Sequence, residues 1–409
     1  MEKRIAVLYY EGRDLNTYPY VTNAVRLLTE KGYLVDIYLT SNMQSSFKIS
    51  GVRLLTVSGL DPAKYTINSL KYIKKNKISY DFILSYSIEG LYVSYLLNKP
   101  SAYFSMELIY KNYLKKLEND LKASIKHFLR LKHIYWLLLP KKFFNKYKEI
   151  KNILLQIDLF KKIQDMKQLI KFSVIMDEKR GELLKEEFGF VDKILYVPNS
   201  YIGFSAEKSD FTYKKFNLPV NKKILLYAGG MEHTFFEEQF PSIINNLSSD
   251  YLIFLNVFSR DGFIKDIIEK YQKEIKENKI YVNTENLSEK EYDQLVKNSY
   301  IGIAWYTKST EDNLYYLGYS SGKINKYLSC GLPAIAPAYY YKYKEFIDDN
   351  NIGRTCDDIY QIPDAVNYIE NNYDFLCKNV ESFYLKNLEY RSKFDQVLSE
   401  INVIISEED

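Results

Sequence analysis

Short apolar runs alternate with longer amphipathic segments along most of the 409-residue chain. Residues 5–10 form the first strand-like run, and residues 18–31 follow with a helical pattern that ends at Gly32. Further strand-like runs occupy 33–40, 52–57, 82–86, 101–105, 172–176 and 194–198. This alternation is typical of a parallel sheet with helical crossovers. Residues 1–198 are therefore predicted to form a Rossmann-like α/β domain.

A second alternating series follows a weakly patterned stretch at 199–221, which suggests an interdomain linker. Its strand-like runs lie at 223–228, 251–257, 279–282, 301–306 and 334–336. They predict a second Rossmann-like domain at 222–376, followed by an amphipathic helical segment at 377–409. The expected architecture is α/β, with two Rossmann-like domains facing a cleft.

Composition narrows the class of protein. With 46% hydrophobic residues and a net charge of +4, the chain can bury a substantial core, which excludes a disordered protein. Its three cysteines, Cys330, Cys356 and Cys377, fit no metal-ligand spacing, so neither a zinc site nor a disulfide scaffold is expected. No signal peptide or long uncharged apolar run is present in the sequence, which favours a cytoplasmic protein that does not span a membrane.

The small net charge hides an uneven distribution. Residues 108–171 hold 16 Lys and Arg against 5 Asp and Glu, whereas the rest of the chain holds 40 against 47. Within this basic insert, residues 128–139 mix cations with bulky apolar side chains, and Pro140 is expected to separate two helices. The insert could rest on an anionic membrane surface, or it could be a helical hairpin with an internal apolar seam and a solvated lysine face. Both interpretations are open at this stage.

The most informative motif is the stretch from Gly318 to Ile335. Ser320, Ser321 and Gly322 stand where a loop enters a helix, so free backbone N–H groups there would point at an anion. Lys323 would add a full positive charge in the first helical turn. The alternative is an ordinary serine N-cap.

A second glycine-containing turn lies earlier in the same predicted domain. Gly229 and Gly230 end a strand-like run, and glycine there would let a phosphate or sugar approach the backbone closely. A tight turn without a ligand is the alternative. Both motifs would lie at the carboxyl ends of strands of one sheet, where open α/β sheets bind ligands.

Taken in order, these motifs resemble a known group of enzymes. The order of 227–230, 281–289, 302–306 and 318–335 is similar to the donor half of GT-B glycosyltransferases, most of all the family 4 type of bacterial glycan assembly. Residues 174–180 and 197–200 resemble the strand, helix and hinge that close the acceptor domain of that group.

The resemblance implies a metal-independent hexosyltransferase that uses a nucleotide sugar, expected to be a UDP-sugar, and needs no other cofactor. Its acceptor would be a cell-surface glycan, a lipid-linked precursor or a protein, and the enzyme would be cytoplasmic or peripheral on the inner face of the cell membrane. The implied nucleotide-sugar residues are Gly229, Gly230, His233, Arg260, Tyr281, Asn286, Tyr306, Ser320, Ser321, Gly322 and Lys323. Lys323 would also stabilise the charge that develops on the leaving phosphate.

The sequence departs from family 4 in two places, one of which is the stretch 231–237, where the usual Arg and Lys after the glycine turn are missing. That group usually carries two glutamates eight positions apart, where this chain has Gly318 and Lys326. The transfer could therefore invert the configuration of the sugar's anomeric carbon as readily as retain it. An inverting enzyme needs a general base from the acceptor domain, for which Glu107 is the first candidate and Glu89 the second, ahead of Glu11 and Asp14, because both stand in short apolar settings.

Two other functions fit the same sequence. A non-catalytic GT-B subunit that supports a partner transferase would explain the missing glutamates, and a GT-B nucleotide-sugar epimerase would use a similar donor site. Nucleic acid is not an expected partner, because the basic insert carries no recognition motif and the remaining chain is acidic.

Overall fold

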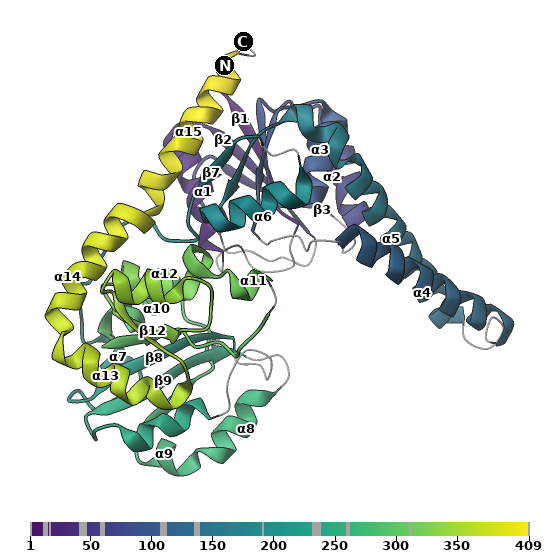
Figure 1. The fold of residues 1–409 in the computed structure, drawn as a ribbon. Coiled ribbons are helices and arrows are strands. Elements are labelled where there is room, and N and C mark those ends of the chain that lie inside the picture. The colour runs from purple at the N-terminus through teal and green to yellow at the C-terminus, as the bar shows by residue number, and fades with distance from the viewer. Residues whose placement is uncertain are drawn as a thin grey trace. The chain divides into compact units, whose positions relative to one another are not determined.

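The computed structural model describes residues 2–10, 15, 18–40, 47–57, 62–106, 113–134, 140–189, 192–230, 239–258, 262–310 and 312–407. The chain divides into two compact units. Unit 1 comprises Met1–Val197 and Phe394–Asp409, and unit 2 comprises Pro198–Lys393. Each unit is built on one parallel sheet flanked by helices, which confirms the predicted α/β class (Figure 1).

The sheet of unit 1 has seven strands in the order β3-β2-β1-β4-β5-β6-β7. Their bounds are β1 Arg4–Leu8, β2 Leu34–Thr40, β3 Val52–Val57, β4 Phe82–Ser85, β5 Ser101–Phe104, β6 Ile170–Ile175 and β7 Ile194–Tyr196. Each predicted strand of this half is present, with ends that differ by a few residues. The order reverses between β1 and β4, so the carboxyl ends of these two strands lie side by side at one edge of the sheet.

The helices of unit 1 connect these parallel strands. They are α1 Pro19–Glu30, α2 Pro62–Lys75, α3 Ile88–Leu97, α4 Tyr113–Ile134, α5 Pro140–Met166 and α6 Glu178–Phe188, with a 3₁₀ turn at Lys167–Leu169. Gly32 follows α1 with a φ of 88°, a backbone angle that suits glycine at a helix end. The sequence-based prediction of this helix end is confirmed.

A buried carboxylate ties three strands of unit 1 together. Asp36 of β2 is fully buried and accepts hydrogen bonds from Arg53 of β3 at 2.7 and 2.6 Å and from Arg4 of β1 at 3.3 and 3.2 Å. Tyr80 donates its hydroxyl to Asp36 Oδ2 at 2.7 Å, and its oxygen lies 2.6 Å from that of Tyr38. Burial by itself raises the pKa of Asp36, but Arg53, Tyr80 and Arg4 outweigh it and lower the pKa.

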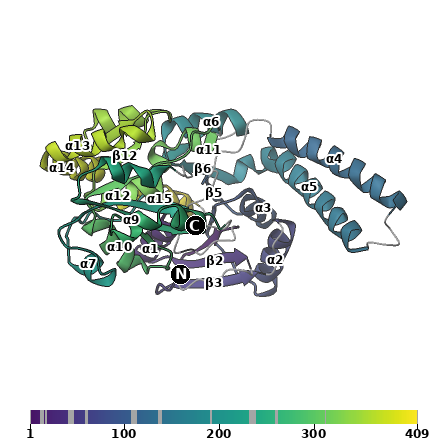
Figure 2. The same cartoon turned by 90° about the horizontal axis from the view of Figure 1, so that it is seen from below.

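The basic insert forms a helical hairpin of α4 and α5. Ser124 donates its hydroxyl to Glu149 Oε1 at 2.8 Å, and Glu118 lies 4.0 Å from Lys161, so the two helices run antiparallel. Leu117 and Ile157 are buried in the unit. The predicted helix boundary at Pro140 is confirmed. In both views the hairpin extends away from the sheet of unit 1 (Figures 1 and 2).

The sheet of unit 2 has six strands in the order β10-β9-β8-β11-β12-β13. Their bounds are β8 Lys223–Gly230, β9 Tyr251–Phe258, β10 Ile280–Asn283, β11 Ile301–Ile303, β12 Ala334–Pro337 and β13 Gly353–Cys356. Successive residues of β8 face opposite sides of the sheet: Ile224 and Leu226 belong to one core, Leu225 and Tyr227 to the other. The sheet is apolar on both faces, which explains why its strands read as continuous hydrophobic runs.

The helices of unit 2 cover both faces of this sheet. They are α7 Phe211–Lys215, α8 Phe263–Lys270, α9 Gln272–Lys276, α10 Glu289–Asn298, α11 Asp312–Tyr315, α12 Gly322–Ser329, α13 Ile362–Asn371 and α14 Tyr373–Phe383, and α15 spans Tyr390–Glu407. Three 3₁₀ helices lie at Phe240–Asn246, Gly318–Ser320 and Ile359–Gln361, and π-helical turns lie at Glu345–Asp349 and Tyr384–Leu388.

Two segments differ from the sequence-based domain boundaries. The stretch 199–221, predicted to be an interdomain linker, lies within unit 2. Its Phe216 and Leu218 are buried in the core of that unit, so the stretch is part of the folded unit. Residues 394–409 group with unit 1, where Glu400 pairs with Lys193 at 2.5 Å and Phe394 packs against Phe104. The predicted carboxyl-terminal helical segment is therefore shared between the two units.

No helix in the described part of the chain is long and apolar enough to cross a membrane.

Replacing Asp36 by alanine tests the buried carboxylate. Removing one partner from a buried ion pair costs about 3 kcal/mol, which corresponds to a fall of roughly 5–10 °C in the thermal midpoint of the full chain. Because the pKa of Asp36 is lowered in the folded state, this deficit should be complete well above pH 4 and shrink as the pH falls below it.

The control is Glu182→Ala, which removes an exposed ion pair of 2.8 Å with Lys179 and should shift the midpoint by less than about 2 °C. Equal midpoints for Asp36→Ala and Glu182→Ala would contradict the assigned role of Asp36.

Candidate functional site

The topology of unit 2 brings the ends of two strands together. Strand order runs outward from β8 through β9 to β10 on one side and from β11 through β12 to β13 on the other. The carboxyl ends of the adjacent strands β8 and β11 therefore meet at the point where the order reverses, which is where open α/β sheets bind ligands. The predicted Gly229–Gly230 turn ends β8, and Tyr306 follows β11.

Lys323 lies against the end of β8, although it is 94 positions away from Gly229 in the sequence. A Cβ added to Gly229 would lie 3.1 Å from Lys323 Cε and 3.4 Å from Nζ. Gly229 has a φ of 139°, which side chains rarely adopt. Glycine at this position therefore keeps the space that the Lys323 side chain fills, and the structure brings the two predicted motifs together.

The ammonium group of Lys323 rests between two aromatic rings. Its Nζ lies 4.0 Å from the ring centroid of Tyr227 and 4.5 Å from that of Tyr306. No carboxylate of the described residues pairs with it. Aromatic faces attract a cation but neutralise no charge, so burial remains the dominant effect and lowers the pKa of Lys323 to about 7. A desolvated cation that no described carboxylate neutralises is suited to bind an anion.

The start of α12 supplies further donors beside Lys323. Ser321 is the N-cap residue: its hydroxyl accepts from Ile324 N–H at 3.4 Å, and its carbonyl accepts from Asn325 N–H at 3.0 Å. The first four N–H groups of a helix lack intrahelical partners, so those of Gly322 and Lys323 remain available to an anion. Ser321 thus acts as a cap, and the helix end keeps two free amides.

Helix α12 is fixed to the sheet by Tyr327, one turn after Lys323. The Ala228 N–H donates to the Tyr327 hydroxyl at 3.0 Å, and that hydroxyl donates to the Ile303 carbonyl at 3.3 Å. A Cβ added to Gly302 would lie 2.2 Å from the Tyr327 ring, so only glycine in β11 allows this approach. Residues four apart share one helix face, and Tyr327 therefore sets the position of Lys323. Sequence reasoning did not identify Tyr327.

Neighbouring residues hold the loop before α12. Ser320 donates its hydroxyl to the Leu317 carbonyl, and Asn199 donates to the Ser320 carbonyl at 3.2 Å. Asn325 donates to the carbonyl groups of Asn199 at 2.9 Å and Tyr319 at 2.8 Å. The Tyr306 hydroxyl lies 3.3 Å from Ser321 Oγ. The Ser320 hydroxyl is used within the loop, and Asn199 and Asn325 are scaffold residues that the sequence did not single out.

The predicted base-binding residues lie at the end of β10. Tyr281 stacks on Phe254 with ring centroids 5.0 Å apart and contacts Phe216, so its ring is part of the packing of unit 2. Asn286 is exposed in the following loop. Asn283 shapes that loop, because its amide donates to Asn256 Oδ1 at 2.7 Å and its Oδ1 accepts from the Glu285 N–H at 3.2 Å.

Lys326 occupies one of the two positions where family 4 enzymes usually carry glutamate. It is buried, forms an ion pair with Asp293 of α10 and lies 4.4 Å from the ring centroid of Tyr201. Gly318, at the other position, begins a 3₁₀ turn. The two lysines of α12 therefore differ: Lys326 pairs with a carboxylate, and Lys323 pairs with none among the residues that the structure describes.

Unit 1 carries the second general-base candidate at its own reversal point. Glu89 lies in the first turn of α3, directly after β4, and burial raises its pKa. A Cβ added to the next residue, Gly90, would lie 2.9 Å from Leu8 Cβ and from Ser85 Oγ, so α3 begins in close contact with β1 and β4. Glu107, His233, Arg260, Glu11 and Asp14 lie outside the described residues.

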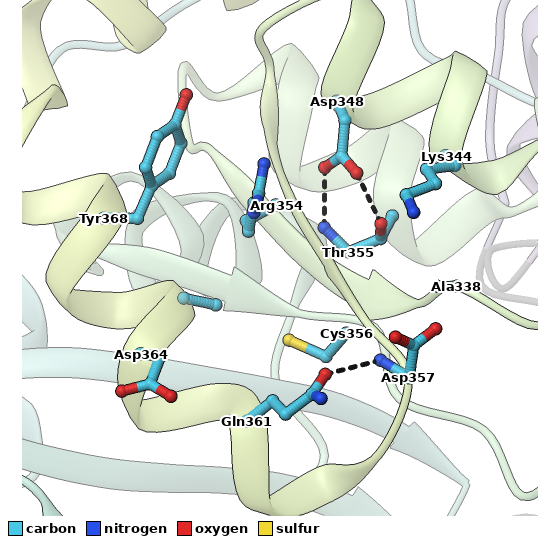
Figure 3. Close-up of a pocket in the computed structure, with 11 residues that line it drawn as sticks. Ala338, Lys344, Asp348, Arg354, Thr355, Cys356, Asp357, Gln361, Asp364 and Tyr368 are labelled. Atoms are coloured by element: carbon cyan, nitrogen blue, oxygen red, sulfur yellow. Dashed lines mark hydrogen bonds between the residues drawn. The ribbon is translucent and has the colours of Figure 1, made fainter.

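A separate pocket of about 380 Å³ lies at the carboxyl ends of β12 and β13 (Figure 3). Its lining includes two cations and three carboxylates: Lys344, Arg354, Asp348, Asp357 and Asp364. Asp348 accepts from Thr355 N–H at 2.8 Å and from its hydroxyl at 2.6 Å, and Arg354 lies over the Tyr368 ring. The pocket contains none of the sequence-predicted residues, and its charges favour neither sign of ligand.

Comparison with known proteins defines the class. Residues 241–389 match the model of the "Glucosyltransferase 3-like, C-terminal domain" family. No curated protein matches the chain. Among solved structures, sucrose-phosphate synthase from Thermosynechococcus elongatus is similar with a TM-score of 0.65 at 12% identity, covering 99% of this chain and 100% of that one.

Two other solved structures are similar over nearly the whole chain. Anabaena HepE, solved with UDP and glucose, has a TM-score of 0.63 at 11% identity and covers 98% of this chain and 100% of its own. WaaG, a glycosyltransferase involved in lipopolysaccharide biosynthesis, has a TM-score of 0.60 at 12% identity and covers 98% and 99%. The fold is GT-B. With the glucosyltransferase 3-like domain in unit 2, the chain is a glycosyltransferase of this fold.

Two single substitutions on α12 test the electrostatic contrast between its lysines. Lys323→Met removes a desolvated cation that pairs with no carboxylate of the described residues, so we expect a thermal midpoint a few degrees above wild type at pH 7. The unfolded chain binds this proton up to about pH 10, whereas the folded chain releases it near pH 7, so wild-type stability rises across that window and the difference should shrink toward pH 10.

Lys326→Met is the matched control, because it removes a neutralised lysine three positions away and leaves Asp293 without its partner. Its midpoint should fall by a few degrees. A lower midpoint for Lys323→Met at pH 7 in the absence of ligand would contradict the view that Lys323 lacks a counter-ion.

Proposed function

We propose that the chain transfers a hexose from a UDP-sugar, bound to unit 2, to a hydroxyl group of a cell-surface glycan, a lipid-linked precursor or a protein. The observation that carries the proposal is the partly buried ammonium group of Lys323, which lies beside Gly229 and the open end of α12. The glucosyltransferase 3-like domain and the HepE complex with UDP and glucose support the choice of donor. WaaG, with its role in lipopolysaccharide biosynthesis, supports a glycan or lipid-linked acceptor.

The proposed site matches the charge of the reaction. The bond between the sugar C1 and the β-phosphate oxygen breaks, a bond from C1 to the acceptor oxygen forms, and the acceptor proton must leave. Negative charge grows on the departing diphosphate, and Lys323 with the Gly322 and Lys323 amides would stabilise it. We expect these groups to act without a metal ion, with Gly230, Ser320, Ser321 and Tyr306 around the phosphates.

The diphosphate would also change the protonation of Lys323. Its pKa of about 7 in the free protein rises when an anion binds, because the ammonium group then gains the counter-ion that it lacks. Binding and protonation are therefore coupled: donor binds to the charged lysine, and deprotonation of free Lys323 weakens binding. Donor affinity should therefore depend on pH, which would not be expected if Lys323 had only a structural role.

The first functional experiment measures UDP-glucose affinity against pH. UDP-glucose carries no group that titrates between pH 6 and 8, so a protein group must cause any change. We expect the dissociation constant to rise about tenfold from pH 6 to pH 8 for wild type, as Lys323 loses its proton. Lys323→Arg should bind with little pH dependence, and Lys323→Met should bind at least tenfold more weakly at pH 6.

A panel of nucleotide sugars in the same assay identifies the donor, since a selective ligand stabilises the fold by mass action. Equal affinity of wild type and Lys323→Met for every nucleotide sugar would refute the donor site.

We propose Glu89 as the general base of an inverting transfer. Burial raises its pKa, and it lies at the carboxyl edge of unit 1, the unit to which the GT-B resemblance assigns the acceptor. Glu89→Gln should lower kcat by 10²- to 10⁴-fold with unchanged UDP-glucose affinity and remove the acidic limb of the pH–rate profile. Glu107→Gln is the comparison, as the alternative base candidate.

Product analysis in the same assay separates the remaining functions. Transfer to an acceptor supports the proposal, free epimerised nucleotide sugar supports an epimerase, and neither product with intact donor binding supports an accessory subunit. We further propose that the enzyme works in the cytoplasm on the inner face of the cell membrane.

A further inference from the structure

The net positive charge of the helical hairpin lies in its distal half, the half farther from the sheet of unit 1. The distal half comprises residues 121–134 of α4 and 140–155 of α5, which contain nine Lys or Arg and one Glu. The proximal half comprises residues 113–120 and 156–166, which contain four of each sign. The single acidic residue of the distal half, Glu149, is neutralised by Lys146 at 2.6 Å. The distal half is therefore strongly positive and the proximal half is neutral.

The proximal half is the part that is attached to unit 1. Helix α5 packs against α3 and α2, and Lys162 near its end donates to the Tyr92 hydroxyl at 3.2 Å and pairs with Asp158. Figures 1 and 2 both show that α4 and α5 extend away from the sheet of unit 1. The charged half is thus the half that extends from the unit.

Large apolar side chains are exposed in the same distal half. Ile125 and Leu129 of α4 are 40% and 52% exposed, and Phe144 and Tyr147 of α5 are 60% and 54% exposed. The contact between Ser124 and Glu149 sets these four at one level along the hairpin. We call them the distal apolar group. They lie beside the internal seam rather than in it, because Ser124 and Phe128, their neighbours along α4, are more buried.

Exposed cations surround this group. Lys122 and Lys126 of α4 and Lys148 and Lys151 of α5 are exposed, and none of them forms an ion pair with another described residue. Such a combination is costly in water alone but fits a bilayer interface, where apolar side chains enter the acyl boundary and lysines meet anionic headgroups. The hairpin thus has an internal apolar seam, as one interpretation of the sequence expects, and a second apolar group that faces outward among lysines.

We propose that the distal half of the hairpin docks unit 1 on an anionic lipid surface. Positive charge with exposed apolar residues matches negatively charged headgroups over acyl chains, and the neutral proximal half would serve as a spacer. The inference deepens the proposed function by indicating where the acceptor is met, namely at a membrane, but it does not depend on the identity of the donor.

Vesicle co-sedimentation of the full chain tests the proposal. Wild type should bind vesicles of phosphatidylcholine and phosphatidylglycerol at 7:3 and not vesicles of phosphatidylcholine alone, and the binding should weaken from 50 to 500 mM salt. Replacing Lys122, Lys126, Lys148 and Lys151 by glutamine should reduce partitioning at least about tenfold. Replacing Ile125, Leu129, Phe144 and Tyr147 by serine should also reduce it at least about tenfold.

The control replaces four other exposed lysines by glutamine: Lys115, Lys116, Lys161 and Lys171. It removes the same charge outside the distal half and should change binding by less than about threefold. Circular dichroism of all variants checks that the helices persist. Equal losses in the control and the distal variants would overturn the proposal, as would equal binding of wild type to neutral vesicles or none to either.

Two further measurements separate this inference from other outcomes. Lys323→Met should bind anionic vesicles like wild type, and both distal variants should retain UDP-glucose affinity, so a failed donor site and a failed docking surface give different patterns. The alternative is that a second copy of this chain, rather than a membrane, covers the distal apolar group. Sedimentation velocity would detect such a dimer. Dimers that disappear in the distal apolar variant, without vesicle binding by wild type, would overturn membrane docking.

Discussion

The desolvated ammonium group of Lys323 is the constraint on which the arrangement of unit 2 depends. A buried charge needs a counter-charge, and no carboxylate within the described ranges supplies one. Three features keep the group in place: the glycine at 229, which leaves room for its side chain; the rings of Tyr227 and Tyr306; and Tyr327, which fixes the helix. The protein thus maintains an unfavourable charge in a defined position, and a diphosphate would relieve it.

The two lysines of α12 illustrate how function and scaffolding differ within one helix. Lys326 is buried with Asp293 and joins α12 to α10, so its charge is satisfied in the folded chain. No carboxylate of the described residues does the same for Lys323. Residue type alone does not distinguish them, and neither does their position in the same short helix. The distinction comes from what the fold places opposite each ammonium group.

Much of the fold could be predicted from the sequence, because parallel strands covered on both faces read as apolar runs. Strand β13 was missed, since Gly-Arg-Thr-Cys lacks that pattern and lies at a sheet edge. Its Gly353 is explained only in space: a Cβ there would lie 1.9 Å from the Ala334 carbonyl. The segment 199–221 was read as a linker because its buried residues, Phe216 and Leu218, are too sparse to form a periodic pattern.

The candidate site could be predicted in part. Both motifs at Gly229 and Lys323 were recognisable, because glycine turns and helix starts have local signatures. The positions of Tyr227, Tyr327 and Asn199 were not, since their roles arise from contacts across about 100 residues of sequence. Ser321 turned out to cap its helix, which is the ordinary role of serine at that position.

Residues 394–407 belong to unit 1 although they follow unit 2 in the sequence, and this order affects folding during synthesis. On the ribosome the strands of unit 1 emerge first, but the helix that supplies Phe394 and Glu400 to that unit emerges only after the whole of unit 2. Unit 2 can therefore complete its packing before unit 1, although it is synthesised later. Until then, the surface of unit 1 that Phe394 covers stays exposed to solvent during synthesis.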